Sequence, residues 1–219
     1  TDQVDAMRML ATCMQFMKRF TDYAAMAKEI DAIAVTPRER LWAIDVMAKS
    51  RFELIHDAES IQLMREGRLL ARDLGDAVLE VNLGEWEALA LSFRGRQQEA
   101  LEIGKTLLAF IEANPQDESI ALRKRQYAYL LEMDNQFERA VELLEDADRR
   151  ARTDGDLGLV SEIQVIRGAC LYNLGQIEAA IDDETAAVML EPVQGEGGII
   201  LAPPGYLAGA REITRRRGV

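Results

Sequence analysis

Apolar residues recur along most of this chain with the spacing of amphipathic helices, and these helices repeat as a unit. Shifting the sequence against itself by 40 residues aligns four segments with small and aliphatic residues in the same columns. The columns read Ala48, Ala88, Ala128 and Gly168; Arg51, Leu91, Leu131 and Leu171; Ser60, Ala100, Ala140 and Ala180; Ile61, Leu101, Val141 and Ile181; and Gly67, Leu107, Ala147 and Ala187. Small residues let helices approach closely, and aliphatic residues fill the space between them. The pattern therefore predicts repeated pairs of packed helices.

Turn and cap residues mark where the expected helices begin and end. Three of the four residues in the turn column suit a left-handed C-cap, and the column reads Ile55, Gly95, Asn135 and Gly175. The connection at 71–76 resembles the one at 151–156, since both begin with Ala-Arg and end in Gly-Asp. Thr36 and Glu39 have the spacing of a capping box, with Pro37 at the first helical position. This predicts a helix that begins at residue 37.

One more helix pair precedes the repeats. Residues 4–17 and 21–33 show helical apolar spacing, with a turn near residues 18–20. Asn114 and Pro115 separate the third pair from the fourth, because proline does not continue a helix. No segment alternates apolar and polar residues as a strand does. We therefore expect an all-α fold of about five antiparallel helix pairs.

The amino-acid composition and net charge argue against some classes of binding partner. The 219 residues are 48% apolar and 29% charged, with a formal net charge of −12. Duplex nucleic acid favours clustered Lys and Arg, so we expect no direct nucleic acid binding by this region. No apolar run approaches the ~18–20 residues of a membrane span, and no signal peptide is apparent. We interpret the start at Thr1 as an excised or processed fragment, so the compartment stays open between cytoplasm, our expectation, and periplasm.

Residue types that carry catalysis or hold metals show no recognisable pattern. The single histidine, His56, lies at an expected turn without a second histidine to form a ligand pair. Cys13 and Cys170 lie far apart in apolar helical patterns, and we expect both to be buried free thiols. The glycine-rich stretch 195–198 lacks the lysine of a phosphate-binding loop. Acidic runs such as 182–184 are typical of a solvated helical face. We expect no cofactor, no metal and no enzymatic activity.

The last repeat carries the pattern of a known family. A small residue, an aliphatic residue, a turn glycine, two alanines and a closing proline stand at Gly168, Leu171, Gly175, Ala180, Ala187 and Pro192. These residues resemble tetratricopeptide repeats (TPR), and the resemblance covers about residues 4–192. The repeat of 40 residues is longer than the family's usual unit of about 34. It is similar to the helical sensor regions of large bacterial regulators. The resemblance implies a right-handed α-solenoid.

The resemblance also implies a binding surface. In TPR proteins, ligands lie in a groove built from first helices, with contacts spaced i, i+3, i+7 and i+10 on one helical face. Carried over to this chain, the spacing implies that the ligand-binding residues include Trp42, Asp45, Lys49, Phe52, Glu85, Leu89, Arg125, Tyr129, Glu132 and Tyr172. Aromatic and Arg anchors dominate interface energies, which favours a peptide or protein ligand. The alternative, above all for Phe52 and Tyr172, is packing inside the solenoid.

The end of the chain leaves the repeat pattern. We expect a TPR-like domain over residues 1–192 and, over 193–219, a Gly/Pro linker with a basic tail or capping helix. An amphipathic helix is expected at 206–215, with an apolar face made of Tyr206, Leu207, Ala210 and Ile213. Such a helix would cap the open apolar end of the solenoid. The alternatives are a disordered tail and a tail that enters the groove in place of a ligand.

These features together predict a non-catalytic module that binds a protein or peptide. We expect it to serve regulation or scaffolding, in a bacterial signalling or transcription-regulating protein. The alternative is a structural module that self-assembles through the ends of its solenoid, which would make the chain a homo-oligomer. An enzyme is the third hypothesis, and no motif supports it.

Overall fold

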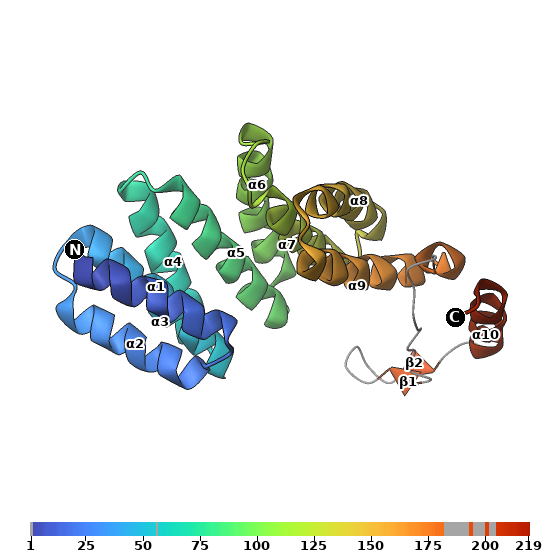
Figure 1. Cartoon of the computed structure of the whole chain (residues 1–219), viewed down its shortest axis with the longest axis horizontal. Helices are drawn as coiled ribbons and strands as arrows, with labels where there is room; N and C mark the ends of the chain where they lie inside the picture. The colour runs from blue at the N-terminus through green and yellow to red at the C-terminus, as the bar shows by residue number, and fades with distance from the viewer. Residues whose placement is uncertain (1, 56, 182–192, 195–199, 202–204) are drawn as a thin grey trace. The chain divides into compact units, whose positions relative to one another are not determined.

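The computed structural model describes residues 2–55, 57–181, 193–194, 200–201 and 205–219. Most of these residues lie in helices (Figure 1). In order along the chain, the elements are α1 (Asp2–Phe16), α2 (Phe20–Ile33), α3 (Pro37–Ile55), α4 (Ala58–Asp73), α5 (Ala77–Phe93), α6 (Gln97–Ala113), α7 (Ile120–Met133), α8 (Phe137–Asp154), α9 (Leu157–Asn173), the 3-10 helix η1 (Ile177–Ala180), β1 (Val193–Gln194), β2 (Ile200–Leu201) and α10 (Tyr206–Arg217). The predicted all-α class and its antiparallel helix pairs are confirmed.

The first compact unit, Thr1–Asn135, contains α1 to α7. Each helix packs against the next one, and the first helices of successive pairs also contact one another, α1 with α3, α3 with α5 and α5 with α7. Figure 1 shows these helices stacked in sequence order. The fully buried core includes Tyr23, Ile30, Leu41, Leu83, Leu91 and Leu131. Because every first helix is packed on several sides, its apolar residues spread around most of its circumference.

Local sequence fixes the helix starts. The predicted capping box is confirmed, since the Thr36 N–H donates to Glu39 Oε2 at 2.9 Å and the Glu39 N–H donates to Thr36 Oγ1 at 3.2 Å. Three aspartates cap the starts of α4, α5 and α9 by accepting from the third residue along, and they are Asp57, Asp76 and Asp156. Asp76 and Asp156 close the two similar connections that the repeat predicted.

Left-handed residues end the helices where the turn column predicted them. Gly95, Asn135 and Gly175 have φ values of 70°, 60° and 71°. The glycines of the two connections, Gly75 and Gly155, have φ values of 72° and 75°. Glycine adopts such a φ without strain and asparagine tolerates it, which explains three of the four residue types in this column.

The second compact unit is Gln136–Val219. Within it α8 packs on α9, and η1 packs on α9. Its core is built from small and aliphatic side chains, which are Ala140, Leu144, Ala147, Val160, Ile163 and Leu171. Cys170 is buried there as predicted, whereas the same prediction is wrong for Cys13, which is exposed on α1. The apolar spacing around Cys13 continues on a face that no core covers.

α10 packs on the end of the last helix. The Tyr206 ring lies edge-on to the Tyr172 ring of α9, with centroids 5.5 Å apart, and Arg216 is 3.2 Å from Glu178 of η1. The predicted helix is confirmed, but its apolar face is wrong at Leu207, which is 45% exposed. Thr214, one turn after Ala210, is buried on that face where Leu207 is not. α10 therefore buries a narrower face than the sequence suggested, and its role as a cap stays a prediction.

Two expectations about the C-terminal part need correction or stay open. In the described part of the C-terminal region, two short strands pair antiparallel, with Val193 facing Leu201 and Gln194 facing Ile200, although no strand was expected. Strands of two residues are too short to show a period of two, and their Val and Ile residues suit extended backbone. Ala187 and Pro192 lie outside the described residues, as does the domain boundary predicted at residue 192. That boundary stays a prediction.

Candidate functional site

Nine of the ten candidate binding residues lie in the first unit, on the first helices α3, α5 and α7. Trp86 of α5 belongs with them because it touches two of them. We call this set the first-helix strip, and it consists of Trp42, Asp45, Lys49, Phe52, Glu85, Trp86, Leu89, Arg125, Tyr129 and Glu132. The strip is continuous in the fold since α3 contacts α5 and α5 contacts α7.

The aromatic residues of α3 are packed inside the first unit. Trp42 is 8% exposed, and the Arg8 guanidinium of α1 lies 5.0 Å from its ring centroid. Phe52 is 4% exposed, and its ring packs edge-on against Trp86 with centroids 5.7 Å apart. Both side chains thus hold first helices together in this structure. Their contact with a ligand stays a prediction.

Charged residues of α3 form a local pair beside the aromatic contact. Lys49 Nζ lies 2.6 Å from Asp45 Oδ1, and both side chains are 12% exposed. The same ammonium lies 6.0 Å from the Trp86 ring centroid, within the range of a cation–π contact. Lys49 is therefore held between a carboxylate and an aromatic face.

A buried ion pair joins α5 to α7. Arg123 Nη1 donates to Glu85 Oε1 at 2.6 Å, and the two side chains are only 4% and 7% exposed. Burial raises the pKa of Glu85, while the positive charges of Arg123 and Lys49 oppose that rise. Arg123 Nε also donates to Ser119 Oγ at 2.8 Å. The ion pair ties α7 to α5, and the hydrogen bond to Ser119, the N-cap residue of α7, holds the Arg123 side chain in place.

The α7 end of the strip is partly accessible to solvent. Tyr129, Glu132, Arg125 and, on α5, Leu89 are all half-buried. Burial raises the pKa of Tyr129, with the Glu132 carboxylate adding to the rise, and burial also raises the pKa of Glu132. Arg125 Nη1 donates to Gln126 Oε1 at 2.8 Å. An apolar side chain, a phenol and both signs of charge therefore lie on adjoining helices, partly open to solvent.

Two charged residues that hold this region together were missed at the sequence level. Arg123 is one, and Glu87 is the other: it is fully buried and accepts from Arg65 Nε at 2.8 Å and Arg68 Nε at 2.7 Å. The repeat alignment could have revealed both residues. In that alignment Arg123 occupies the column of Ala43, Leu83 and Ile163. Glu87 occupies the column of Met47, Tyr127 and Arg167. A charge in a buried column requires a buried partner.

Tyr172, the tenth candidate, belongs to the second unit. Its ring is covered by Tyr206 of α10, as described above. Burial and the neighbouring Tyr172 hydroxyl raise the pKa of Tyr206 to about 12. The structure therefore assigns Tyr172 to the α9–α10 contact and leaves its ligand-binding role as a prediction.

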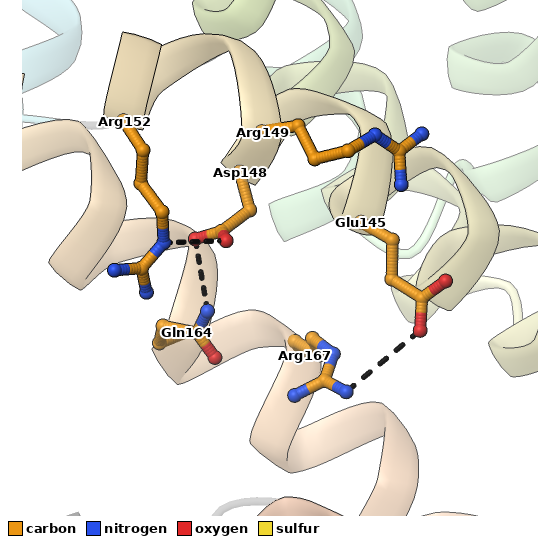
Figure 2. Close-up of a pocket in the computed structure, with 6 residues that line it drawn as sticks. All are labelled: Glu145, Asp148, Arg149, Arg152, Gln164 and Arg167. Atoms are coloured by element: carbon orange, nitrogen blue, oxygen red, sulfur yellow. Dashed lines mark hydrogen bonds and ion pairs between the residues drawn. The ribbon is translucent and has the colours of Figure 1, made fainter. Parts of the chain in front are cut away.

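The second unit also contains a charged recess between α8 and α9, of about 270 Å³ (Figure 2). Its lining residues are Glu145, Asp148, Arg149, Arg152, Gln164 and Arg167. Asp148 accepts from Arg152 Nε at 2.7 Å and from Gln164 Nε2 at 2.9 Å, and Arg167 lies 3.7 Å from Glu145. Ligand pockets are mostly apolar with a few polar groups, and this recess is lined by polar groups throughout. Its charges satisfy one another across the two helices.

Neither region has the geometry of a metal centre. Among the described residues, no three His, Cys, Asp or Glu side chains are grouped to hold an ion. None of the helices in the described part of the chain combines the length and apolarity needed to cross a membrane. What the first-helix strip offers chemically is contact area, aromatic faces and paired charges, which are the means of binding.

The sequence comparisons with known proteins match the C-terminal part of the chain. Residues 156–219 match the family model of class-III aminotransferases. The acetylornithine aminotransferase of Mycolicibacterium smegmatis is 56% identical over 46 residues, and that of Mycobacterium tuberculosis is 62% identical over 42 residues. These matches cover 21% and 19% of this chain but only 12% and 10% of the relatives. The matched stretch includes α9 and α10 and overlaps the last TPR-like repeat, 168–192.

The solved structures resemble the helical repeats. PlcR of Bacillus thuringiensis, solved in complex with the peptide PapR7 and DNA, has a TM-score of 0.69 at 16% identity and covers 82% of this chain and 67% of its own. A putative kinesin light chain of Podosopora anserina with TPR-like repeats has a TM-score of 0.63 at 16% identity, over 98% and 96% of the two chains. The fold is that of TPR-like repeats. At this low identity the likeness shows the fold alone.

Proposed function

We propose that the first unit binds a peptide or a segment of another protein along the first-helix strip. In this proposal the chain acts as a regulatory or scaffolding module of a bacterial signalling or transcription-regulating protein. The observation that carries the proposal is the half-exposed group at the α7 end, where Leu89, Arg125, Tyr129 and Glu132 adjoin a rigid pair of helices. Aromatic, apolar and Arg side chains together are typical of interface hot spots.

Preorganisation of the strip supports this proposal. Lys49 is held by Asp45 and Trp86, and the Glu85–Arg123 pair fixes α5 against α7. Side chains that are already ordered lose little entropy when a ligand binds. A surface of this kind therefore needs fewer new contacts to reach a given affinity.

The charge balance of the strip indicates how it would recognise its ligand. With Arg123 included, its charged residues are Asp45, Glu85, Glu132, Lys49, Arg123 and Arg125, three of each sign. A neutral surface on an acidic chain attracts a ligand by apolar and aromatic contact more than by net charge. We therefore expect affinity to depend only weakly on salt, whereas a charge-driven site would lose affinity steeply.

The structural neighbours offer a precedent for the class of ligand. PlcR was solved with a peptide, and its structure matches 82% of this chain. We extend only the class of ligand, a peptide, to this chain. The distinctive side chains of the strip would set which peptide binds.

Intrinsic fluorescence can test the proposal directly, because both tryptophans of the chain, Trp42 and Trp86, belong to the strip. A peptide selected from a random display library against the whole chain should change their emission. Tyr129→Ala and Leu89→Ala should each weaken binding about tenfold or more, the loss of an anchor worth ~1.4 kcal/mol or more. Leu69→Ala is the matched control, since Leu69 is a half-exposed leucine of α4 outside the strip. Binding that is unchanged in both strip variants would reject the site.

We further propose that the chain catalyses no reaction by itself. The aminotransferase match supports this reading because it corresponds to only 10–12% of those proteins, whereas an active site draws its groups from many parts of a fold. The test is amino-group transfer from acetylornithine to a 2-oxo acid, with the Mycolicibacterium smegmatis relative as positive control under the same conditions. Turnover by this chain would contradict the proposal.

A further inference from the structure

Glu132 of α7 is a half-buried carboxylate, and within the described part of the chain no Lys or Arg forms an ion pair with it. Burial alone raises its pKa, whereas the corresponding rise at Glu85 is opposed by two nearby cations. Arg125, the nearest basic residue along α7, is seven residues away, which is about 10 Å along the helix axis. Burying a carboxylate without a counter-charge is costly, so Glu132 is suited to receive a cation.

Tyr129 gives Glu132 an aromatic neighbour. The two residues are three positions apart on α7, so their side chains share one face, and both are half-buried. The Glu132 carboxylate contributes to the raised pKa of Tyr129, in agreement with a short distance between the two groups. Tyr129 therefore stays a neutral phenol, and its ring can attract a cation.

The first unit holds cations of its own with the same combination of groups. Two of its basic side chains each pair with a carboxylate at 2.6 Å and lie beside an aromatic ring, 6.0 Å and 4.9 Å from the ring centroid. These sets are Lys49 with Asp45 and Trp86, and Arg123 with Glu85 and Phe110. Glu132 and Tyr129 are a carboxylate and a ring of this kind, but the described residues supply no cation that pairs with Glu132.

We propose that Glu132 and Tyr129 bind a basic side chain, Lys or Arg, of the peptide that occupies the first-helix strip. This rests on the proposed function of the first unit and specifies the ligand chemistry at one end of the strip. The carboxylate accepts hydrogen bonds from the cation, while the aromatic ring contacts its face or its stem. Leu89, half-buried on the adjoining α5, offers apolar contact to the rest of that side chain.

The wider distribution of charge also favours a cation at this place. Glu132 lies in the last turn of α7, where the partial negative charge of the helix C-terminus attracts a positive group. Residues 130–133 of that turn include no Lys or Arg. The whole chain carries a net charge of −12, which attracts a basic ligand as it approaches. An acidic ligand side chain would be repelled by the same charges.

One half-buried ion pair agrees with the weak salt dependence expected of the strip. A partly buried pair is screened by salt less than a pair in full solvent. Apolar and aromatic contact still supplies most of the affinity, and the ion pair determines which peptides bind.

Peptides selected from a random display library against the whole chain are the probe. Selection should enrich Lys or Arg at one position of the peptide. The selected peptide is then synthesised in two forms, one with the basic residue and one with its neutral isostere, norleucine for Lys or citrulline for Arg. Removing the charge should weaken binding about tenfold, measured by the fluorescence of Trp42 and Trp86.

Variants of the chain complete the cycle. Glu132→Gln should weaken the charged peptide about tenfold and leave the neutral peptide almost unchanged, because only the charged form uses the carboxylate. Glu112→Gln is the matched control, an exposed glutamate of α6 in the same unit, and it should affect neither form. Tyr129→Phe keeps the ring and should keep the charge preference, whereas Tyr129→Leu should weaken the charged form more than the neutral one. Circular dichroism checks that each variant keeps its helix content.

The outcomes separate this proposal from the proposed function on which it rests. Selected peptides that lose affinity in Leu89→Ala, yet contain no preferred basic residue, would show that the strip binds peptides and that this proposal is wrong. The same holds if Glu132→Gln weakens the charged and the neutral form equally. Failure to select any peptide, or affinity that is unchanged in both Leu89→Ala and Tyr129→Ala, would reject the binding site and this proposal together.

Discussion

Replacing Arg123 by methionine should destabilise the first unit by about 3–5 kcal/mol, because Glu85 would stay buried without its counter-charge. In the native structure the two side chains are 4% and 7% exposed and 2.6 Å apart, so water cannot replace the lost guanidinium. Arg123 also donates to Ser119 and covers the Phe110 ring at 4.9 Å. Methionine keeps most of the apolar stem, which leaves the loss of charge as the main effect.

The pair, rather than either residue alone, is the unit to be tested. Glu85→Met combined with Arg123→Met should cost less than Arg123→Met by itself, because no buried charge is left unpaired. Arg96→Met is the matched control in the same unit. It breaks a solvent-exposed ion pair with Glu99, so it should leave the stability of the unit almost unchanged.

Urea unfolding followed by tryptophan fluorescence suits this test, because both tryptophans, Trp42 and Trp86, lie in the first unit. The pH dependence gives a second readout with a defined sign. Burial raises the pKa of Glu85 in the folded state, and removing Arg123 removes the charge that opposes this rise. A raised folded pKa favours the folded state at low pH and loses that benefit as pH rises through it. The deficit of Arg123→Met should therefore grow from about pH 4.5, the ordinary value of the carboxyl, upwards.

Specific results would refute this reasoning. A loss below about 1 kcal/mol for Arg123→Met would mean that the pair is solvated in solution. A double variant that loses the sum of the two single losses would mean that Glu85 and Arg123 act independently. A deficit that shrinks with rising pH would contradict the assigned origin in the Glu85 carboxylate.

Three further predictions test the helix register of α8 and the cap at the start of α3. Ala140→Leu should destabilise the second unit by about 1–3 kcal/mol, because Ala140 is fully buried. Glu142→Ala, on the exposed face of α8, should change the stability by no more than ~0.5 kcal/mol. Thermal unfolding followed by circular dichroism measures both, and equal shifts would mean a wrong register. Thr36→Ala should cost about 1 kcal/mol through loss of the cap at α3. The backbone N–H groups of Thr36 and Val35 lower the pKa of Glu39 to about 2, so the stability that Glu39 contributes is present above its ordinary value and lost as pH falls towards 2. Glu39→Gln should abolish that acid dependence, and a variant as acid-sensitive as the native chain would contradict it.

The helix pairs could be predicted from the sequence because local chemistry and periodicity agree there. The capping box at Thr36 and the left-handed residues Gly95, Asn135 and Gly175 each act within a few residues, so their sequence suffices. The 40-residue repeat then fixes how often the same helix pair recurs. α10 was predictable for the same reason, since its apolar residues share one side of a short helix. The width of its buried face was not predictable, and Leu207, expected in that face, is 45% exposed.

Burial in the first-helix strip was harder to predict, because the first helices are packed on more than one side. Helical spacing shows that Trp42, Lys49 and Phe52 share a face, but it does not show whether that face meets solvent or a neighbouring helix. In the structure Phe52 of α3 packs on Trp86, whereas Tyr129 of α7 stays half-exposed. Only the position of the next helix decides between these outcomes.

Charged residues within the apolar columns of the repeat carry information about contacts between helices. A column that is apolar in three repeats and charged in the fourth, as at Arg123, implies a partner within reach on an adjoining helix. Glu85 is that partner, and it stands in the column of Asp45, Arg125 and Val165. Pairs of this kind distinguish one repeat from the next in a stack whose apolar columns are nearly interchangeable. A buried ion pair contributes little net stability, but it penalises a shifted register, because a shift would leave both charges unpaired. The same two residues thus fix the α5–α7 contact on which the proposed binding surface depends.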